Sequence, residues 1–382
     1  MKRAPEQIKG RQRTQCGIPS IAMIATYKYR IKDSNRKDIL QRMASHTNYV
    51  WNYSNAYIKT MWKTSRKYTS KFDIHPLTKG ASKLLDINSQ TIQAISDECV
   101  TRTKKARKHL RFRSARKNLG WIPFKGQTIK YCGDYLVYNG TKFRFWEHRK
   151  LPEGAKIKCG SFNSDARGRW YINLAVEIPT PDEVIPLNLD TAVGIDPGVK
   201  TVLTTSEGVK YERESFTNKY QDKLAKAQRH KKKRQVKKIN AKIKNSRLDW
   251  NHKVTKELSD QHDMIFFGDV SSKKLARTNM AKGVLDASWY QMFQFLQYKT
   301  LRRGGIALLV SEKFSTCTCS VCFQRTGPSG LRGLGIREWK CESCGTVHDR
   351  DVNSAQNILR FGHETLRQPT AAEGSPHYSA CA

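Results

Sequence analysis

Long apolar runs are missing from this sequence of 382 residues. A helix that crosses a bilayer needs roughly 18 or more consecutive apolar residues, and no stretch approaches that length. The opening residues, MKRAPEQIKGRQRTQ, are too polar for the apolar segment of a signal peptide. We therefore expect an intracellular, soluble protein without a membrane partner.

Acidic residues are also scarce, with 33 Asp and Glu against 70 Lys and Arg, a formal net charge of +37. Such a chain repels itself unless a polyanion neutralises it. Nucleic acid is the expected partner, because every neutralised phosphate releases counterions. A ribosomal or chromatin-like packing protein is one alternative. A basic membrane-surface protein is less favoured, since no basic amphipathic helix stands out. The charge predicts a cytoplasmic, nucleoid-associated protein.

The ten cysteines do not form the pattern of a disulfide framework. Four of them make two C-x-x-C pairs, Cys319 with Cys322 and Cys341 with Cys344. In a reducing compartment this arrangement indicates a metal site, because two such pairs can place four thiolates around one tetrahedral Zn²⁺. We predict a zinc ribbon in which the metal is structural. Cys317, two residues before the first pair, remains an alternative ligand.

Changes in composition predict an order of domains. Residues 1–33 contain an N-terminal segment and a first strand, and apolar residues at helical spacing follow. A stretch rich in Val, Ile, Tyr, Trp and Phe reads as hairpins of a small β-barrel, and a Pro-rich boundary ends it. The expected divisions are 1–33, 34–119 (helical), 120–186 (barrel), 187–316, 317–344 (zinc ribbon), 345–362 and 363–382 (a disordered tail).

Two segments concentrate positive charge with little or no acid to offset it. The first, 102–117, contains nine Lys and Arg, and the second, 219–250, reads as a very basic helical segment. One-sign clusters of this kind are typical of surfaces that follow a phosphate backbone, whereas a solvated helix face usually mixes signs. The predicted nucleic-acid-binding residues are Lys104, Lys105, Arg107, Lys108, Arg111, Arg113, Arg229, Lys231, Lys232, Lys233 and Arg234.

Two motifs carry carboxylates in places suited to metal chemistry. In GIDPG, residues 194–198, Asp196 lies at the end of an apolar strand, where nucleases of the RNase H type hold a divalent metal; a simple Asp-Pro-Gly turn is the alternative. In HDRDVNSAQNIL, residues 348–359, Asp351 lies near the start of a predicted helix. A helix N-cap is a competing explanation for this second carboxylate.

In their order along the chain, these motifs resemble the TnpB family of transposon-encoded RNA-guided nucleases. GIDPGVK, a long basic helix, an apolar strand, STCTCSVC and CESCGTVHDRDVNSAQNIL carry the resemblance, which is strong over 190–362. Residues 23–186 match in layout only. The resemblance implies an α+β multidomain protein: an RNase H-like (RuvC) α/β nuclease domain with an inserted zinc ribbon, a β-barrel wedge domain and a helical recognition domain.

The resemblance also implies three catalytic acids. The first falls on Asp196 and the last on Asp351, with Asp349 as second choice. The position of the middle acid, at the end of the strand in DMIFFGD, is occupied by Gly268. Asp269 should point to the opposite face of the sheet. A twist or bulge at Gly268 is the alternative that would bring Asp269 back. Some members of the TnpB family carry the acid at the end of the next strand instead, so the resemblance implies that Glu312 is the relocated catalytic acid; a solvated Glu at a strand end is the competing explanation.

The activity implied is RNA-guided cleavage of double-stranded DNA, with Asp196, Glu312 and Asp351 holding two catalytic Mg²⁺ ions. A guide RNA would supply sequence recognition by base pairing. Three alternatives remain: a nuclease-dead, repressor-like relative that binds DNA with a guide, a small type V CRISPR effector, and a protein-only RNA-binding module. The sequence does not decide between a monomer and a dimer.

Overall fold

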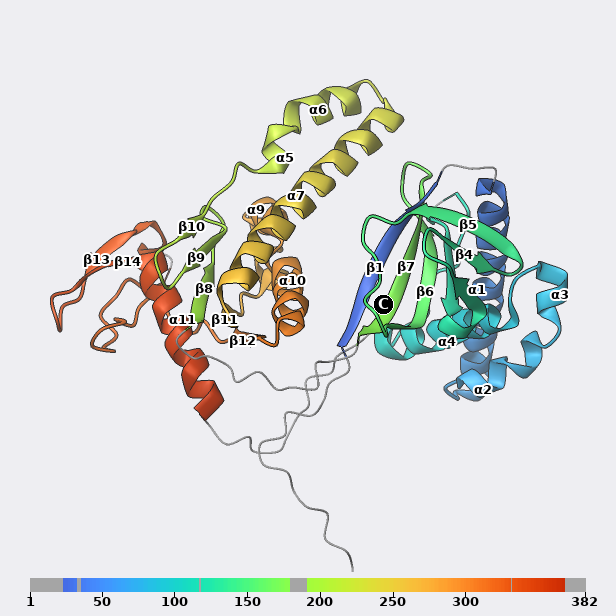
Figure 1. Cartoon of the computed structure of the whole chain (residues 1–382), viewed down its shortest axis with the longest axis horizontal. Coiled ribbons are helices and arrows are strands. Elements are labelled where there is room, and N and C mark those ends of the chain that lie inside the picture. The colour runs from blue at the N-terminus through green and yellow to red at the C-terminus, as the bar shows by residue number, and fades with distance from the viewer. Residues whose placement is uncertain (1–22, 33–35, 117, 179–190, 331, 368–382) are drawn as a thin grey trace, which may run out of the picture. The chain divides into compact units, whose positions relative to one another are not determined.

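The computed structural model describes residues 23–32, 36–116, 118–178, 191–330 and 332–367. The chain divides into two compact units at about residue 180, and each is described by itself (Figure 1). The sequence expectations for the N-terminal segment, the Pro-rich boundary and most of the tail lie outside the described residues.

A seven-stranded antiparallel sheet organises the first unit. Its spatial order is β2-β6-β7-β1-β5-β4-β3. The strands are β1 (Met23–Ile31), β2 (Trp121–Lys125), β3 (Ile129–Tyr131), β4 (Tyr135–Tyr138), β5 (Thr141–Trp146), β6 (Lys156–Ser164) and β7 (Trp170–Ile178). The two strands at the ends of this order follow one another in the chain, joined by a single helical turn at Gly126–Thr128. The sheet is therefore nearly closed, in agreement with the predicted barrel.

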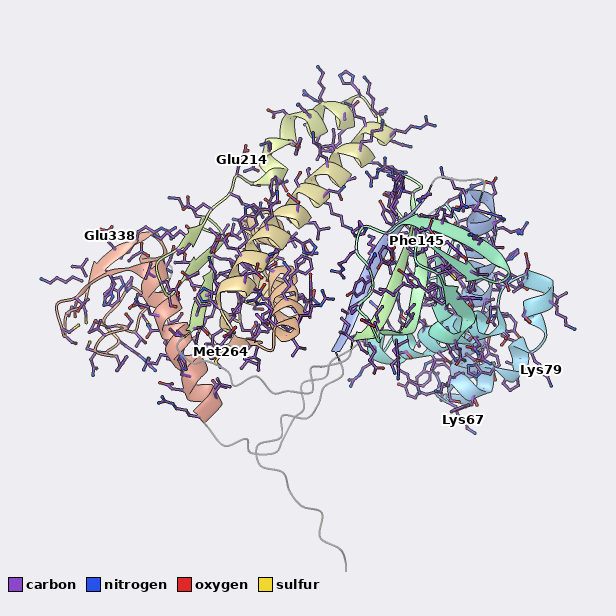
Figure 2. The ribbon with its side chains drawn as sticks, in the orientation of Figure 1. Lys67, Lys79, Phe145, Glu214, Met264 and Glu338 are labelled. Carbon is purple, nitrogen blue, oxygen red and sulfur yellow. The ribbon has the colours of Figure 1, made fainter. Side chains whose placement is uncertain are left out.

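Alternation along these strands explains the core of the sheet. On β5, Phe143 and Phe145 are fully buried while the residues between and beside them are exposed; Figure 2 labels Phe145. Because side chains of a strand point alternately to opposite faces, one face fills the interior. The helices of this unit are α1 (Lys37–Ser65), α2 (Lys71–Ile74), α3 (Ala81–Leu85) and α4 (Ser89–Ala106).

The second unit is built on a five-stranded sheet of order β10-β9-β8-β11-β12. The strands are β8 (Ala192–Pro197), β9 (Leu203–Thr205), β10 (Lys210–Tyr211), β11 (Met264–Gly268) and β12 (Ile306–Val310). Strands β8, β11 and β12 run parallel. Every residue of β11 is buried, which accounts for its unbroken apolar sequence, since a parallel strand is covered on both faces.

Helices cover the two faces of this sheet (Figure 1). One face buries Val193, Ile195 and Phe267 against residues of α7 and α10. The other buries Met264, Phe266 and Val310 beneath Ile358 of α11. The helices of the unit are α5 (Phe216–Lys219), α6 (Gln221–Arg229), α7 (Lys233–Gln261), α8 (Ser272–Leu275), α9 (Ala281–Ala287), α10 (Trp289–Arg302) and α11 (Arg350–Arg367).

Two expected boundaries differ in the structure. The basic segment 219–250 is divided between α6 and α7, with Lys231 in the left-handed region at φ 50°, and α7 continues to Gln261. Residues 363–367, expected to belong to a disordered tail, instead form the end of α11. Among the described helices, none combines the length and the hydropathy that a membrane crossing requires.

A buried ionic network holds the helices of the second unit together. Asp286 is 3% exposed and pairs with Arg213 at 3.2 Å and with Arg247 at 2.6 Å. Burial opposes ionisation of this carboxyl, but hydrogen bonds from Ser215 and Thr217 and the two guanidinium charges lower its pKa. The network joins the segment before α5 to α7 and α9.

We expect Asp286→Ala to lower the free energy of unfolding by about 3–5 kcal/mol, because the buried guanidinium of Arg213 and the partly buried one of Arg247 lose their counter-charge. The exposed pair Asp249–Lys253 gives the control, and Asp249→Ala should cost about 0.5 kcal/mol or less. Since the folded pKa of Asp286 is lowered, its contribution is complete above the unfolded pKa of about 3.9 and disappears as the pH falls. Urea unfolding at neutral and acidic pH measures both effects, and equal losses for the two variants would contradict this role.

Candidate functional site

Asp196 lies at the end of β8 with its carboxylate turned toward α11. Its neighbours Ile195 and Pro197 are buried, and alternation along the strand places Asp196 on the opposite face from Ile195. The Ser354 hydroxyl of α11 donates a hydrogen bond to Asp196 Oδ1 at 2.9 Å. Burial, together with the charges of Asp351 and Glu312, raises the pKa of Asp196 to about 7, although the Ser354 hydrogen bond opposes the shift.

The position of the missing acid, Gly268, lies on the same face as Asp196. Phe267 pairs with Ile195, so continuing the register by one residue sets Gly268 beside Asp196. A Cβ at Gly268 would come within 3.0 Å of Pro197 Cδ and 3.1 Å of Ile358 Cδ1. Any side chain here would therefore displace its neighbours. Asp269 is exposed, and its backbone N–H bonds to Val310 O at 2.8 Å.

Glu312 lies two residues beyond the end of β12 instead of closing the strand as predicted. Gly268 pairs with Val310, and a spacing of two residues returns a side chain to the same face of an extended chain. Burial raises the pKa of Glu312, and the charge of Asp269 acts in the same direction. Glu312 is in turn one of the charges that raise the pKa of Asp196.

Asp351 is the freer of the two acids at the start of α11. Asp349 Oδ1 accepts hydrogen bonds from the N–H groups of Asp351 and Val352, both at 3.0 Å, so Asp349 caps the helix. Its other oxygen binds Lys210 Nζ at 2.6 Å. The N-cap explanation considered for Asp351 therefore applies to Asp349. Asp351 makes a longer contact of 3.4 Å with Arg337.

These carboxylates are coupled by charge. Among the described residues, the four cysteines are the one group of at least three side chains placed to hold a metal ion together, with their sulfurs within 4.8 Å of one another. Asp196, Glu312 and Asp351 are more widely spaced in this structure. Acids whose charges act on one another remain suited to divalent cations, because carboxylate oxygen is the ligand that Mg²⁺ prefers.

Helix α11 also holds the segment that leads from Glu312 into the ribbon. The amide groups of Asn353 and Asn357 both donate to Thr318 O, at 2.8 and 2.7 Å. Asn353 Oδ1 accepts from the N–H of Ser320 at 2.9 Å. The buried hydroxyls of Ser315 and Ser354 are 2.8 Å apart. One helix therefore contacts Asp196, carries Asp351 and fixes the segment after Glu312.

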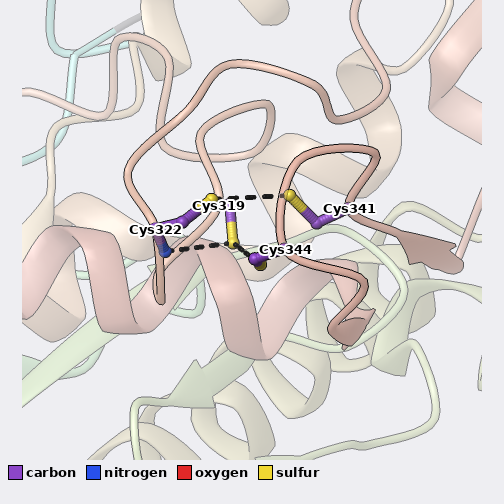
Figure 3. Close-up of side chains that lie close together, drawn as sticks. All are labelled: Cys319, Cys322, Cys341 and Cys344. Carbon is purple, nitrogen blue, oxygen red and sulfur yellow. Dashed lines mark hydrogen bonds between the residues drawn. The ribbon is translucent and has the colours of Figure 1, made fainter.

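The sulfurs of Cys319, Cys322, Cys341 and Cys344 come together as the sequence predicts (Figure 3). The Sγ–Sγ distance is 3.6 Å for Cys319 and Cys344 and 3.5 Å for Cys322 and Cys341. Four thiolates around a tetrahedral zinc lie roughly 3.8 Å apart, given a Zn–S bond of about 2.3 Å. The cluster therefore fits Zn²⁺. A hydrogen bond with the Thr326 hydroxyl lowers the pKa of Cys341, which favours the thiolate form.

Other residues complete the ribbon. Trp339 packs on Cys319 and Cys341, and its ring lies 4.7 Å from that of His348. His348 Nε2 lies 3.0 Å from Cys319 Sγ, a contact that sequence reasoning did not anticipate. Cys317 is outside the cluster, with its sulfur 3.5 Å from Phe314 O.

The predicted nucleic-acid-binding residues are exposed, with one exception. Arg113 has its guanidinium 5.3 Å from the ring of Trp51 and 5.0 Å from that of Trp121. Its backbone exchanges hydrogen bonds of 2.7 and 2.8 Å with the side chain of Asn52. Burial lowers the pKa of Arg113. These contacts give Arg113 a structural role in the first unit.

Comparisons with known proteins identify proteins of similar fold and a matching family model. The chain shares its fold with Cas12f1, as seen in the cryo-EM structure of a Cas12f1–sgRNA–target DNA complex. The TM-score is 0.54 at 14% identity, and the match covers 85% of this chain and 82% of that one. A family model described as Cas12f1-like, TNB domain, matches residues 289–358, a range that contains the whole cysteine cluster.

Curated relatives point to the particular family. A putative RNA-guided DNA endonuclease of Streptomyces pristinaespiralis is 33% identical over 232 residues, covering 56% of this chain and 55% of that protein. InsQ of Escherichia coli K12, a putative RNA-guided DNA endonuclease, is 31% identical over 231 residues, covering 53% and 56%. The TnpB-like protein L79 of Acanthamoeba polyphaga mimivirus is 27% identical over 233 residues, covering 54% and 43%.

These matches confirm the resemblance to the TnpB family. The aligned stretch spans about half the length of each curated relative.

Proposed function

We propose that this chain is a transposon-associated, RNA-guided DNA endonuclease that hydrolyses phosphodiester bonds. The observation that carries the proposal is the electrostatic coupling of Asp196 to Glu312 and Asp351. The names of the relatives, putative RNA-guided DNA endonucleases, support the same activity. We assign the five-stranded sheet with α11 as an RNase H-like (RuvC) nuclease domain, with the limits that the sequence predicts except at the end, where α11 extends to Arg367.

In this proposal, Asp196, Glu312 and Asp351 hold Mg²⁺, and the four cysteines hold a structural Zn²⁺. When bound, Mg²⁺ would activate water and stabilise the leaving 3′ oxygen. The Ser354 hydroxyl fixes the orientation of the Asp196 carboxylate. The exposed basic residues of 102–116 and of α6 and α7 bind the phosphates of a guide RNA and of double-stranded target DNA.

The test is cleavage of a guide-matched DNA duplex by the purified ribonucleoprotein in the presence of Mg²⁺. The wild type should cut, whereas Asp196→Asn, which removes the charge with little change in shape, should bind the duplex and leave it intact. A wild type that binds its target but never cuts would refute the nuclease assignment. That outcome favours the nuclease-dead, repressor-like alternative. The DNA that neighbours the gene tests the type V effector alternative. A CRISPR array would favour that alternative, whereas transposon ends would favour the proposed function.

The raised pKa of Asp196 predicts a pH dependence of the Mg²⁺ requirement. Because the carboxylate must be deprotonated to bind a cation, the Mg²⁺ concentration that gives half-maximal cleavage should fall as the pH rises through about 7. Ser354→Ala removes a hydrogen bond that stabilises the ionised form, so this dependence should move to higher pH.

Ser320→Ala is the matched control, because Ser320 also bonds to α11, through Gln356. Equal pH profiles for Ser354→Ala and the wild type would show that the hydrogen bond to Asp196 has no effect on its ionisation.

A further inference from the structure

Two phenylalanines, one just before the ribbon and one inside it, have a backbone conformation that bulky residues rarely adopt. Phe314 has φ 67° and Phe323 has φ 63°, both in the left-handed region where a bulky side chain is uncommon. Their side chains are not buried, with exposed fractions of 41% and 52%. Burial of an apolar surface therefore gives an incomplete account of why phenylalanine stands at these positions.

The two zinc knuckles allow a direct comparison of residue choice. The N–H of Phe323 bonds to Cys319 O at 3.0 Å, and in the second knuckle the N–H of Gly345 bonds to Cys341 O at 2.9 Å. Gly345 has φ 75°, close to the angle at Phe323. The same turn therefore has glycine in the second knuckle, where a positive φ favours that residue, and phenylalanine in the first. Strained backbone of this kind is found mainly at functional sites.

Positive charge lies against both rings. The guanidinium of Arg325 is 4.0 Å from the centre of the Phe314 ring, and that of Arg360 is 4.2 Å from the centre of the Phe323 ring. Lys313 lies 5.0 Å from the Phe314 ring. Half-exposed rings beside cations match the chemistry of a single nucleic-acid strand, whose bases stack on aromatic faces while its phosphates attract positive charge.

The location connects these rings with the carboxylates. Phe314 follows Glu312 by two residues, and Arg360 lies on α11, the helix that carries Asp351. We propose that Phe314 and Phe323 form a base-stacking surface that binds an unpaired strand next to the carboxylate cluster. The inference rests on the proposed function, since it specifies how the strand to be cut is held.

Binding of short oligonucleotides by the full-length, zinc-containing protein tests this inference. Without Mg²⁺ the strand is not cut, so the result does not depend on cleavage. The probes are a fluorescent oligothymidylate and an abasic strand of equal length, which carry the same phosphates. The ratio of the dissociation constants for the abasic strand and for oligothymidylate reports on contacts with the bases, because the phosphates are the same in both. The variant is Phe314→Gly with Phe323→Gly, because glycine favours φ values near +65°.

We expect the double variant to keep or raise the melting temperature of the wild type. Its preference for oligothymidylate over the abasic strand should fall about fivefold or more, since stacking contributes about 1–3 kcal/mol per base. Tyr290→Ala, at an exposed aromatic residue of α10, should leave the preference unchanged. An unchanged preference in the double variant, or a lowered melting temperature, would mean that the rings serve the ribbon's own packing and would overturn the inference. The proposed function would not be affected by that outcome, because cleavage by the wild type tests it separately.

Discussion

Glu312→Gln should abolish DNA cleavage while Asp269→Asn leaves it nearly intact. Loss of a metal-binding carboxylate removes several kcal/mol of stabilisation from the transition state, which corresponds to a rate lower by about a hundredfold or more. Glu312 acts on the pKa of Asp196, whereas Asp269 is exposed. The two substitutions are matched, because each converts an acid to its amide at the same edge of the sheet.

Single-turnover cleavage of a guide-matched duplex measures the rates, and a gel-shift assay shows that target binding is retained. If Asp269→Asn abolished cleavage and Glu312→Gln did not, the catalytic acid would lie next to Gly268 after all. If neither variant lost activity, the proposed set of three carboxylates would be wrong.

Replacing a zinc ligand should eliminate cleavage even though the zinc site is separate from the carboxylates. Zinc contributes on the order of 10 kcal/mol or more to the folding of a small tetrathiolate site, so Cys341→Ala should unfold the ribbon. The amides of Asn353 and Asn357 would then lose the carbonyl of Thr318, and the segment from Glu312 to the first knuckle would no longer be fixed to α11. We expect loss of bound zinc together with loss of cutting.

Cys317→Ser is the control, because Cys317 belongs to the same segment but lies outside the cluster. Metal analysis should find one zinc per chain in the wild type and in this control. Retention of zinc by Cys341→Ala, or loss of zinc in Cys317→Ser, would show that the four ligands are assigned incorrectly. Activity that persists in a zinc-free variant would disprove the link between ribbon and nuclease site.

Features that depend on neighbouring residues were predictable from the sequence. Hydrophobic runs predicted β11, and the two C-x-x-C pairs predicted the sulfur cluster. Alternation along a strand also predicts that Asp269 is the poorer substitute for an acid at Gly268, which the cleavage assay of Asp269→Asn tests. Each of these conclusions needs only the local geometry of a strand or a turn, which the spacing of residues reveals.

Features that depend on contacts between distant segments were not predictable. Ser354 and Asp196 form a hydrogen bond although 158 positions separate them in the sequence. No pattern in either segment predicts this contact. Arg113 belongs to a basic cluster typical of phosphate binding, yet tertiary packing places it between two tryptophan rings. The break between α6 and α7 occurs at Lys231 without a glycine or proline to signal it, because the left-handed turn there falls on a lysine.

The order of elements along the chain has a consequence during protein synthesis. Strand β8 with Asp196 leaves the ribosome first, Glu312 follows, and α11 with Asp351 and Ser354 is the last described element. A nascent chain that has not yet released α11 lacks one carboxylate and the hydroxyl that orients another. Under the proposed function, ribosome-bound chains stalled before Arg350 should therefore be unable to cleave DNA.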